Sequence, residues 1–430
     1  MKNIKSIIWA SAALPMLVLS EAPLIREGSV TLGPLGNTSY YEIGYILDDV
    51  PAVITVDVQT NGVSIGGEKL VNMTGDLGRV IQPGSRKVLW QARNMVPNQV
   101  FENATAVVTA WVTNNPPPYM VLSMDSVTPP VYYASTNTIP HWGENTNRLY
   151  KTDKIVLKKI PAANVRWRMG SPTDETCRNT GGREIAHWVT LTENYYMGVY
   201  PCTQYQYKLL TGNSGGPAFK DYEDYNYRPV GKIPYYVVRG GRSNGIDWPT
   251  SGTNVTANSV IGHLRSKALC SWIDLPTEAQ WEFACRADEG AALYNGKELT
   301  QEVWTTGAAP SLYDLGWYAH NCKDDTPDGV AQTHEVGKKQ PNAWGLYDML
   351  GNVYEWCLDW DSSGAEYSDG SPVVDPEGIK VPSTYHRICR GGCYEYAASE
   401  CRSACRGRGS DENSWYERHG FRFCAKALAK

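Results

Sequence analysis

Three runs in the first quarter of the chain alternate between apolar and polar residues. They are "AVITVDVQTNG" (52–62), "RKVLWQA" (86–92) and "ATAVVTAWVT" (104–113). Alternation with a period of two is typical of half-buried strands, and the Asn-Gly pair that ends the first run indicates a hairpin turn. The pattern predicts a small all-β domain over residues 22–118. Several short strands in about 100 residues favour an immunoglobulin-like β-sandwich.

The strand pattern stops at a proline-rich break, "NNPPP" (114–118). Residues 119–155 carry scattered polar residues and a further proline pair, which predicts a linker with an edge strand. From residue 156 short strand-like runs alternate with glycine-rich loops. We therefore place a second domain at 156–430.

Two segments of this second domain are predicted to be helical. The first is "PCTQYQYKLLTG" (201–212), where Thr203 is a suitable N-cap and Gly212 follows the last turn. The second, "LPTEAQWEFACRAD" (275–288), begins with a capping box at Thr277.

The chain begins with a different pattern, two lysines followed by an apolar run from Ile7 to Leu19. Small residues come directly after it, as at a leader-peptide cleavage site, which predicts a secretory signal peptide over residues 1–20. The alternative is a short membrane anchor, but the run is short for a bilayer. No later segment is long and apolar enough to span one. We expect an exported protein, either secreted, periplasmic or bound at the cell surface.

Composition narrows the functional classes. The net charge of −5 and the lack of a long basic run give no reason to expect a nucleic-acid partner. All eleven cysteines lie at or after Cys177, which supports a domain boundary before that residue. An exported chain permits disulfides, but an odd number leaves at least one thiol unpaired within a monomer.

Long motifs of the second domain, in one order, resemble the formylglycine-generating-enzyme or sulfatase-modifying-factor family. They are "RWRMGS" (166–171), "HWVTLTENYYMGVYPCTQYQY" (187–207), "LPTEAQWEFACRA" (275–287), "PNAWGLYDMLGNVYEWCLDW" (341–360), "RICRGGCY" (387–394), "CRSACR" (401–406) and "GFRFC" (420–424). The resemblance implies an α+β fold, an irregular relative of the C-type lectin fold with few regular elements.

The family that these motifs resemble has mixed functions. Some members oxidise a sulfatase cysteine to formylglycine with copper and oxygen, and others are iron-dependent sulfoxide synthases. Many members are binding domains, among them the variable proteins of diversity-generating retroelements. Because one fold serves all of these functions, only the site residues can choose between them.

The resemblance also implies a structural calcium site in "GLYDMLGNVYEW" (345–356). On the matching positions Asp348 and Glu355 would supply carboxylate oxygens, and Gly351 and Val353 backbone carbonyls, a mixed oxygen set that calcium tolerates. The alternative is that the two carboxylates only brace the loop by hydrogen bonds. A weaker second calcium site would use Asn321.

The catalytic cysteine pair of the family is not matched. Catalytic members need two cysteines five positions apart, because soft thiolates hold Cu(I). Here Cys401 and Cys405 are four apart, in a segment about three residues shorter than in the family. They remain weak candidates for a shifted copper pair. An active copper-dependent formylglycine-generating oxidase is thus the alternative function.

The resemblance implies a structural role for other cysteines. Cys285, on the capped helix, matches a family cysteine that bridges to the C-terminal strand, which suggests a Cys285–Cys424 disulfide. A second pairing, Cys357–Cys401, would join two segments that the family packs together. Connectivity cannot be fixed from sequence.

Residues 393–419 contain many positions that do not follow the family pattern, although the frame residues around these positions are family-like. Loops rich in Tyr, Trp, Arg and Ser on a stiff frame are how paratopes are built. We therefore expect a non-catalytic binding protein whose partner is a protein or surface ligand. One alternative is that the positions of this loop are diversified, and the other is that it is an ordinary solvated loop. The expected ligand residues are Cys393, Tyr394, Glu395, Tyr396, Cys405, Arg408, Trp415, Tyr416, Arg418 and His419.

Overall fold

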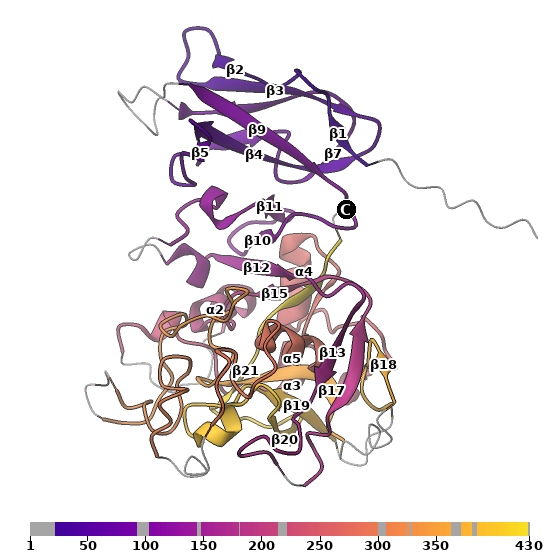
Figure 1. Ribbon diagram of the computed structural model, residues 1–430, viewed down its shortest axis with the longest axis vertical. Coiled ribbons are helices and arrows are strands. Elements are labelled where there is room, and N and C mark those ends of the chain that lie inside the picture. The colour runs from indigo at the N-terminus through magenta and orange to yellow at the C-terminus, as the bar shows by residue number, and fades with distance from the viewer. Residues whose placement is uncertain are drawn as a thin grey trace, which may run out of the picture.

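The computed structural model describes most of the chain. The described residues are 22–92, 103–143, 148–179, 181–213, 222–299, 307–324, 326, 329–362, 371–380 and 385–428, without the side chains of 408–410. The expected signal peptide lies outside them. Within them, no helix is long and apolar enough to cross a membrane. The molecule is mostly β-structure with a few short helices (Figure 1).

The strands from β1 to β9 form two antiparallel sheets that share one hydrophobic core. One sheet has the order β1-β3-β8-β6, with β2 also on β3. The other has the order β5-β4-β7, with β9 on β4. The strands are β1 (Leu24–Ile25), β2 (Thr31–Pro34), β3 (Tyr41–Asp48), β4 (Ala52–Thr60), β5 (Val63–Ser64), β6 (Met73–Gly75), β7 (Val80–Ile81), β8 (Gly84–Trp90) and β9 (Ala104–Trp111).

The three alternating runs of the sequence are β4, β8 and β9, and the Asn-Gly hairpin is confirmed. Asn61 and Gly62 both have positive φ, 51° and 78°, between the paired strands β4 and β5. Positive φ at both central residues is what a two-residue hairpin turn requires. The immunoglobulin-like topology stays a prediction.

The segment 119–155 is more than a linker. It contributes β10 (Tyr119–Ser123) and β11 (Val131–Tyr133) to a six-stranded sheet of order β11-β10-β12-β15-β22-β16. Met120, Val121 and Leu122 are all buried, so β10 lies inside the sheet with both of its faces covered. The other strands of this sheet are β12 (Lys154–Ile160), β15 (Tyr195–Gly198), β16 (Ile273–Asp274) and β22 (Cys424–Lys426).

Two smaller sheets complete the second unit. A three-stranded sheet has the order β13-β14-β18, and a four-stranded sheet has the order β20-β19-β17-β21. Their strands are β13 (Val165–Met169), β14 (His187–Leu191), β17 (Tyr354–Trp360), β18 (Val373–Val374), β19 (His386–Arg390), β20 (Arg406–Asp411) and β21 (His419–Gly420). Strands β19 and β20 lie at the end of the molecule that is farthest from the β1–β9 unit (Figure 1).

Both expected helices are confirmed with their caps. Thr203 caps α2 (Gln204–Thr211), and Thr277 caps α5 (Glu278–Arg286), each in a reciprocal capping box. Sequence reasoning missed α4 (Val260–Ala268), capped by Ser259, and the single turn α3 (Tyr235–Val238).

Candidate functional site

The frame of the expected ligand loop is held by buried arginines. Arg390, Arg402, Arg406 and Arg422 are each at most 6 % exposed. Each forms an ion pair with a buried glutamate that is distant in sequence. The pairs are Arg390 with Glu278 and Glu282, Arg402 with Glu175 and Glu184, Arg406 with Glu278, and Arg422 with Glu355.

These pairs fix the geometry at both ends of the loop. Arg402 donates to both oxygens of Glu184 at 2.9 Å, and Arg422 to both oxygens of Glu355 at 2.7 Å. Bidentate arginine–carboxylate pairs are strong and geometrically specific. The family-like residues are therefore a rigid scaffold for the residues between them.

Four side chains of the loop gather on the surface, and we call Tyr396, Trp415, Tyr416 and Arg418 the aromatic face. Trp415 is 53 % exposed, Tyr416 43 % and Tyr396 36 %. The Arg418 guanidinium lies 4.6 Å from the Tyr416 ring centroid and 5.1 Å from that of Tyr396. Glu395 pairs with Arg418 at 3.3 Å. The face thus exposes apolar area together with hydrogen-bonding groups.

The segment that carries Trp415 and Tyr416 is pinned to the region of α3. The Lys232 backbone N–H donates to the Tyr416 carbonyl at 3.1 Å, and the Tyr236 N–H to the Glu412 carbonyl at 3.2 Å. The Trp415 ring also packs edge-on against Tyr236, with centroids 6.4 Å apart. Both aromatic side chains are therefore presented from a braced backbone.

Four of the ten expected ligand residues are not on this surface. Cys393, Tyr394, Cys405 and His419 are at most 4 % exposed, so their assignment to the ligand face is corrected. His419 packs under the face against Trp356, with ring centroids 4.8 Å apart. Desolvation lowers its pKa to about 3, which keeps the ring neutral. The Arg408 side chain lies outside the described part of the chain.

Cys393, Cys401 and Cys405 lie close together but are buried. The Cys405 thiol donates to the Glu400 carboxylate at 3.5 Å, whereas Cys401 packs against Gly392. Burial raises the pKa of Cys393 to about 12, and those of Cys401 and Cys405 well above the ordinary thiol value. Thiolates are the metal ligands and nucleophiles, so this environment does not fit a reactive copper pair.

The two expected disulfides are not formed, since Cys285, Cys357, Cys401 and Cys424 are buried thiols without a disulfide bond. Cys424 contacts Gln280 near the start of α5, whereas Cys285 lies near the end of that helix against Ser403. Five residues of helix correspond to about 7.5 Å along its axis, which separates the two sulfurs. Cys357 is turned toward its own strand, with the Glu355 carbonyl as its partner, rather than toward Cys401.

The expected calcium loop is already braced by hydrogen bonds. The Glu355 carboxylate accepts from Arg422 and from the Trp281 indole at 2.7 Å, so its charge and both oxygens have partners. That carboxylate does not fit a calcium ligand. Asp348 is buried, accepts from the Gly337 backbone and the Asn352 side chain, and has a pKa raised by burial.

The remaining calcium candidates have structural contacts as well. Gly351 donates its N–H to the Gly391 carbonyl, and Val353 is buried. Asn321 bridges its own turn, accepting from the Tyr318 N–H and donating to the Gly316 carbonyl. Among the described residues, no group of three or more His, Cys, Asp or Glu side chains is placed to hold a metal ion. Calcium binding through carbonyl oxygens stays a prediction.

Sequence reasoning missed the residues that support the aromatic face. Tyr236 lies about 180 positions before Trp415, and Glu412 is buried where it accepts from the Arg242 backbone N–H at 3.0 Å. Neither carries a local motif that could have indicated this role. Only the folded topology brings them together.

The chain is similar to known proteins over most of its second unit. The family model "Sulfatase-modifying factor enzyme 1-like domain" matches residues 159–427. A formylglycine-generating enzyme of Thermomonospora curvata is 31% identical over 216 residues, 46% of this chain and 66% of that protein. One of Streptomyces coelicolor is 36% identical over 181 residues, 39% of this chain and 52% of that protein. The chain thus spans about half to two thirds of these two relatives.

Among solved structures, "Treponema denticola variable protein 1" is similar at 22% identity with a TM-score of 0.45, covering 64% of this chain and 95% of that one. PvdO from Pseudomonas aeruginosa is similar at 22% identity with a TM-score of 0.47, covering 63% of this chain and 94% of that one. From the extent of the family match, the chain belongs to the sulfatase-modifying factor enzyme 1-like family.

Proposed function

We propose that this chain is an exported binding protein that recognises a protein or other surface ligand through the aromatic face. The observation that carries the proposal is the exposure of Tyr396, Trp415 and Tyr416 around Arg418 on a braced backbone. Trp, Tyr and Arg dominate binding hot spots, and rigid aromatic side chains lose little entropy on binding. Export is proposed from the apolar leader sequence alone.

The environment of the thiols supports binding over oxidation. Copper-dependent oxidation of a substrate cysteine needs accessible thiolates, and Cys401 and Cys405 are at most 4 % exposed with raised pKa values. The cysteine spacing of the catalytic relatives is also absent from the sequence. Formylglycine generation therefore remains the weaker alternative function.

We also propose that exposed positions within 393–419 are diversified. The frame arginines are buried in ion pairs, whereas the aromatic face is solvent-exposed. Substitutions would therefore be tolerated in the aromatic face and not at the frame arginines. Sequencing the same locus in sister isolates tests this directly. Substitutions confined to exposed positions of 393–419 would support it, and an even spread along the chain would contradict it.

The binding function is tested with a triple variant, Trp415→Ala, Tyr416→Ala and Arg418→Ala. Full-length proteins are immobilised and probed with solubilised surface proteins of the host's own cells, and bound species are identified by mass spectrometry. We expect at least one species that binds the natural chain and is lost from the variant. A matched control, Trp188→Ala, removes an exposed tryptophan from another sheet and should retain it.

The catalytic alternative is tested on the same preparations. The chain is loaded with copper and incubated with a peptide that carries the cysteine motif of sulfatases. We expect unmodified cysteine by mass spectrometry. Conversion to formylglycine, or identical binding partners for the triple variant and the natural chain, would overturn the proposal.

A further inference from the structure

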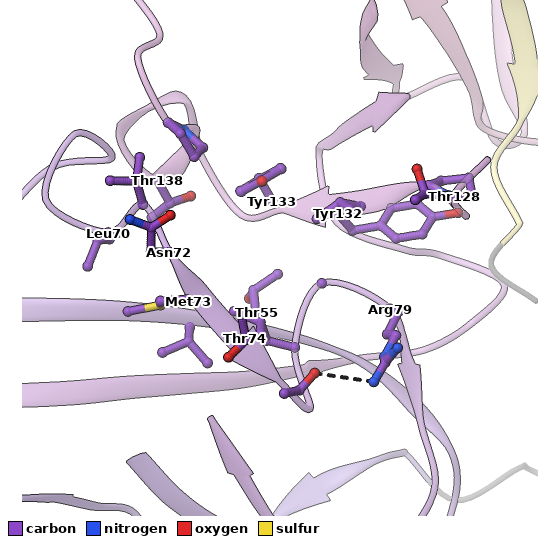
Figure 2. Close-up of a pocket in the computed structure, with 18 of the residues that line it drawn as sticks. Thr55, Leu70, Asn72, Met73, Thr74, Arg79, Thr128, Tyr132, Tyr133 and Thr138 are labelled. Carbon is purple, nitrogen blue, oxygen red and sulfur yellow. Dashed lines mark hydrogen bonds between the residues drawn. The ribbon is translucent and has the colours of Figure 1, made fainter. Parts of the chain in front are cut away.

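A groove of about 690 Å³ lies at the junction of the two units (Figure 2). One wall comes from residues 55–79 of the β1–β9 unit, and the other mainly from residues 128–141. All of its described lining residues precede the family match of 159–427. The groove lies at the opposite end of the second unit from β19 and β20 (Figure 1). Its volume is within the range of about 300–1,000 Å³ typical of ligand sites.

The walls of the groove are held together by direct contacts between the units. The Tyr132 backbone N–H of β11 donates to the Gly78 carbonyl at 2.9 Å. A Cβ on Gly67 would lie 2.3 Å from the Ile139 carbonyl oxygen, so the backbone segments at Gly67 and Ile139 are in contact, without space for a side chain on Gly67. Val53 also belongs to the same hydrophobic core as Met120. The groove is therefore preformed rather than a gap between loosely joined domains.

Both walls include a strand at the edge of its sheet. β6 is the last strand of its sheet and β11 the first of the six-stranded sheet, and all residues of both strands line the groove. The Asp76 N–H bonds the Lys87 carbonyl of β8, so alternation turns the backbone groups of Met73 toward the free edge of β6. The Gly75 carbonyl on the same edge already accepts from the Leu77 N–H at 3.1 Å and from Arg79 at 3.3 Å. A free strand edge is a template for an added extended chain.

The side chains of the groove are basic, hydroxylic and apolar. Arg79, His141 and Lys154 line it, and no Asp or Glu is among its described lining residues. Within the described part of the chain, neither Arg79 nor Lys154 forms an ion pair, and the Arg79 guanidinium contacts only the Gly75 carbonyl, at 3.3 Å. In a chain of net charge −5, this basic lining favours an anionic ligand.

The layout of the groove suits an extended ligand. Thr55, Thr74 and Tyr133 lie along its middle, between Arg79 and Thr128 at one end and Asn72 and Thr138 at the other (Figure 2). The hydroxyl and cationic donors face a space without carboxylate acceptors. The lining hydroxyls can accept as well as donate hydrogen bonds, so the preference for an acidic ligand rests on the cations Arg79 and Lys154.

We propose that the groove binds an extended acidic peptide segment of a partner protein, laid along the free edge of β6. Main-chain hydrogen bonds to β6 would supply affinity, and the acidic side chains would reach Arg79 and Lys154. The apolar lining, including Leu70 and Met73, would take the side chains between them. This site is independent of the aromatic face, and its failure would leave the proposed function of that face untouched.

An array of random hexapeptides, probed with the full-length chain at low salt, tests the proposal. We expect the bound peptides to be enriched in Asp and Glu, and the best of them to bind at least tenfold more weakly to an Arg79→Glu, Lys154→Glu variant. N-methylation of alternate peptide nitrogens should cause a similar loss, because it removes strand pairing. The control variant, Arg166→Glu with Arg168→Glu, reverses two charges on β13 and should bind normally.

Three outcomes of the peptide experiments would overturn the proposal. They are an array without bound peptides, bound peptides without acidic enrichment, and affinities that are unchanged by reversal of Arg79 and Lys154. Binding of a sulfated oligosaccharide instead, with loss in the same variant, would show that the groove takes a different anion and would also reject the peptide. Unchanged thermal unfolding of each variant establishes that the fold is intact.

Discussion

Buried carboxylates in this chain have two kinds of surroundings. Glu184 and Glu355 each form an ion pair with a buried arginine. Asp359 accepts a hydrogen bond from the Glu278 backbone N–H at 2.7 Å, but it is fully desolvated and close to the Glu278 charge. Burial first, and then that like charge, raise the pKa of Asp359 to about 7. The residue is thus protonated in the folded chain over a range of pH where it is ionised in the unfolded chain.

The first prediction concerns this proton. The unfolded pKa of Asp is about 3.9, so the contribution of Asp359 to stability falls as pH rises from about 4 to about 7 and is constant above that. Asp359→Asn should remove this dependence and stabilise the protein at pH 8 by an amount on the order of 2–4 kcal/mol. Urea unfolding at pH 5 and pH 8 measures both effects. Asp125→Asn, at an exposed position, is the control, and an unchanged pH dependence in Asp359→Asn would contradict the assignment.

At the scale of elements, the local features of the fold could be predicted and the distant pairings could not. The β4–β5 hairpin and the caps at Thr203 and Thr277 were predicted because their signals lie within a few residues. The pairing of Arg402 with Glu184 joins residues 218 positions apart, and nothing in the local sequence indicates it. For the same reason the loop 393–419 was predicted as one exposed surface, although Cys393 and His419 are buried, Cys393 in the core that contains Tyr354 and Trp356 of β17 and His419 against the Trp356 ring.

The second prediction is that the buried frame arginines contribute more to the free energy of unfolding than the aromatic face does. Arg402→Met leaves two buried glutamates without their cation, and breaking a buried ion pair costs about 3–5 kcal/mol. Trp415→Ala removes a half-exposed ring and should cost less than about 1 kcal/mol. Chemical denaturation of both variants gives the two free energies of unfolding. Equal losses would mean that the aromatic face is part of the scaffold, and would contradict its role as a variable surface.

At the scale of the molecule, the two units act as one body with sites at opposite ends. The apolar cluster that contains Met120 and Leu122 also contains Val53 of the first unit, so the core continues across the junction. The Tyr132 hydroxyl donates to the Leu428 carbonyl at 3.1 Å, which ties the C-terminal segment to β11 as well. The proline-rich break therefore marks a turn between packed sheets, and the aromatic face and the groove are held at a fixed separation.

The third prediction tests this rigid junction. In Gly67→Ala the added methyl group would lie 2.3 Å from the Ile139 carbonyl oxygen, so the segment around Ile139 must move. Overpacking of this kind costs about 1–3 kcal/mol. Hydrogen exchange should become faster in peptides that cover residues 131–142, where the Trp142 N–H donates to Ile139, and should stay slow in β17 and β19. Gly33→Ala, where a Cβ meets no atom within 4 Å, is the matched control. Equal exchange in both variants would contradict the rigid junction, because the displaced Ile139 segment would then leave the neighbouring backbone hydrogen bonds of residues 131–142 undisturbed.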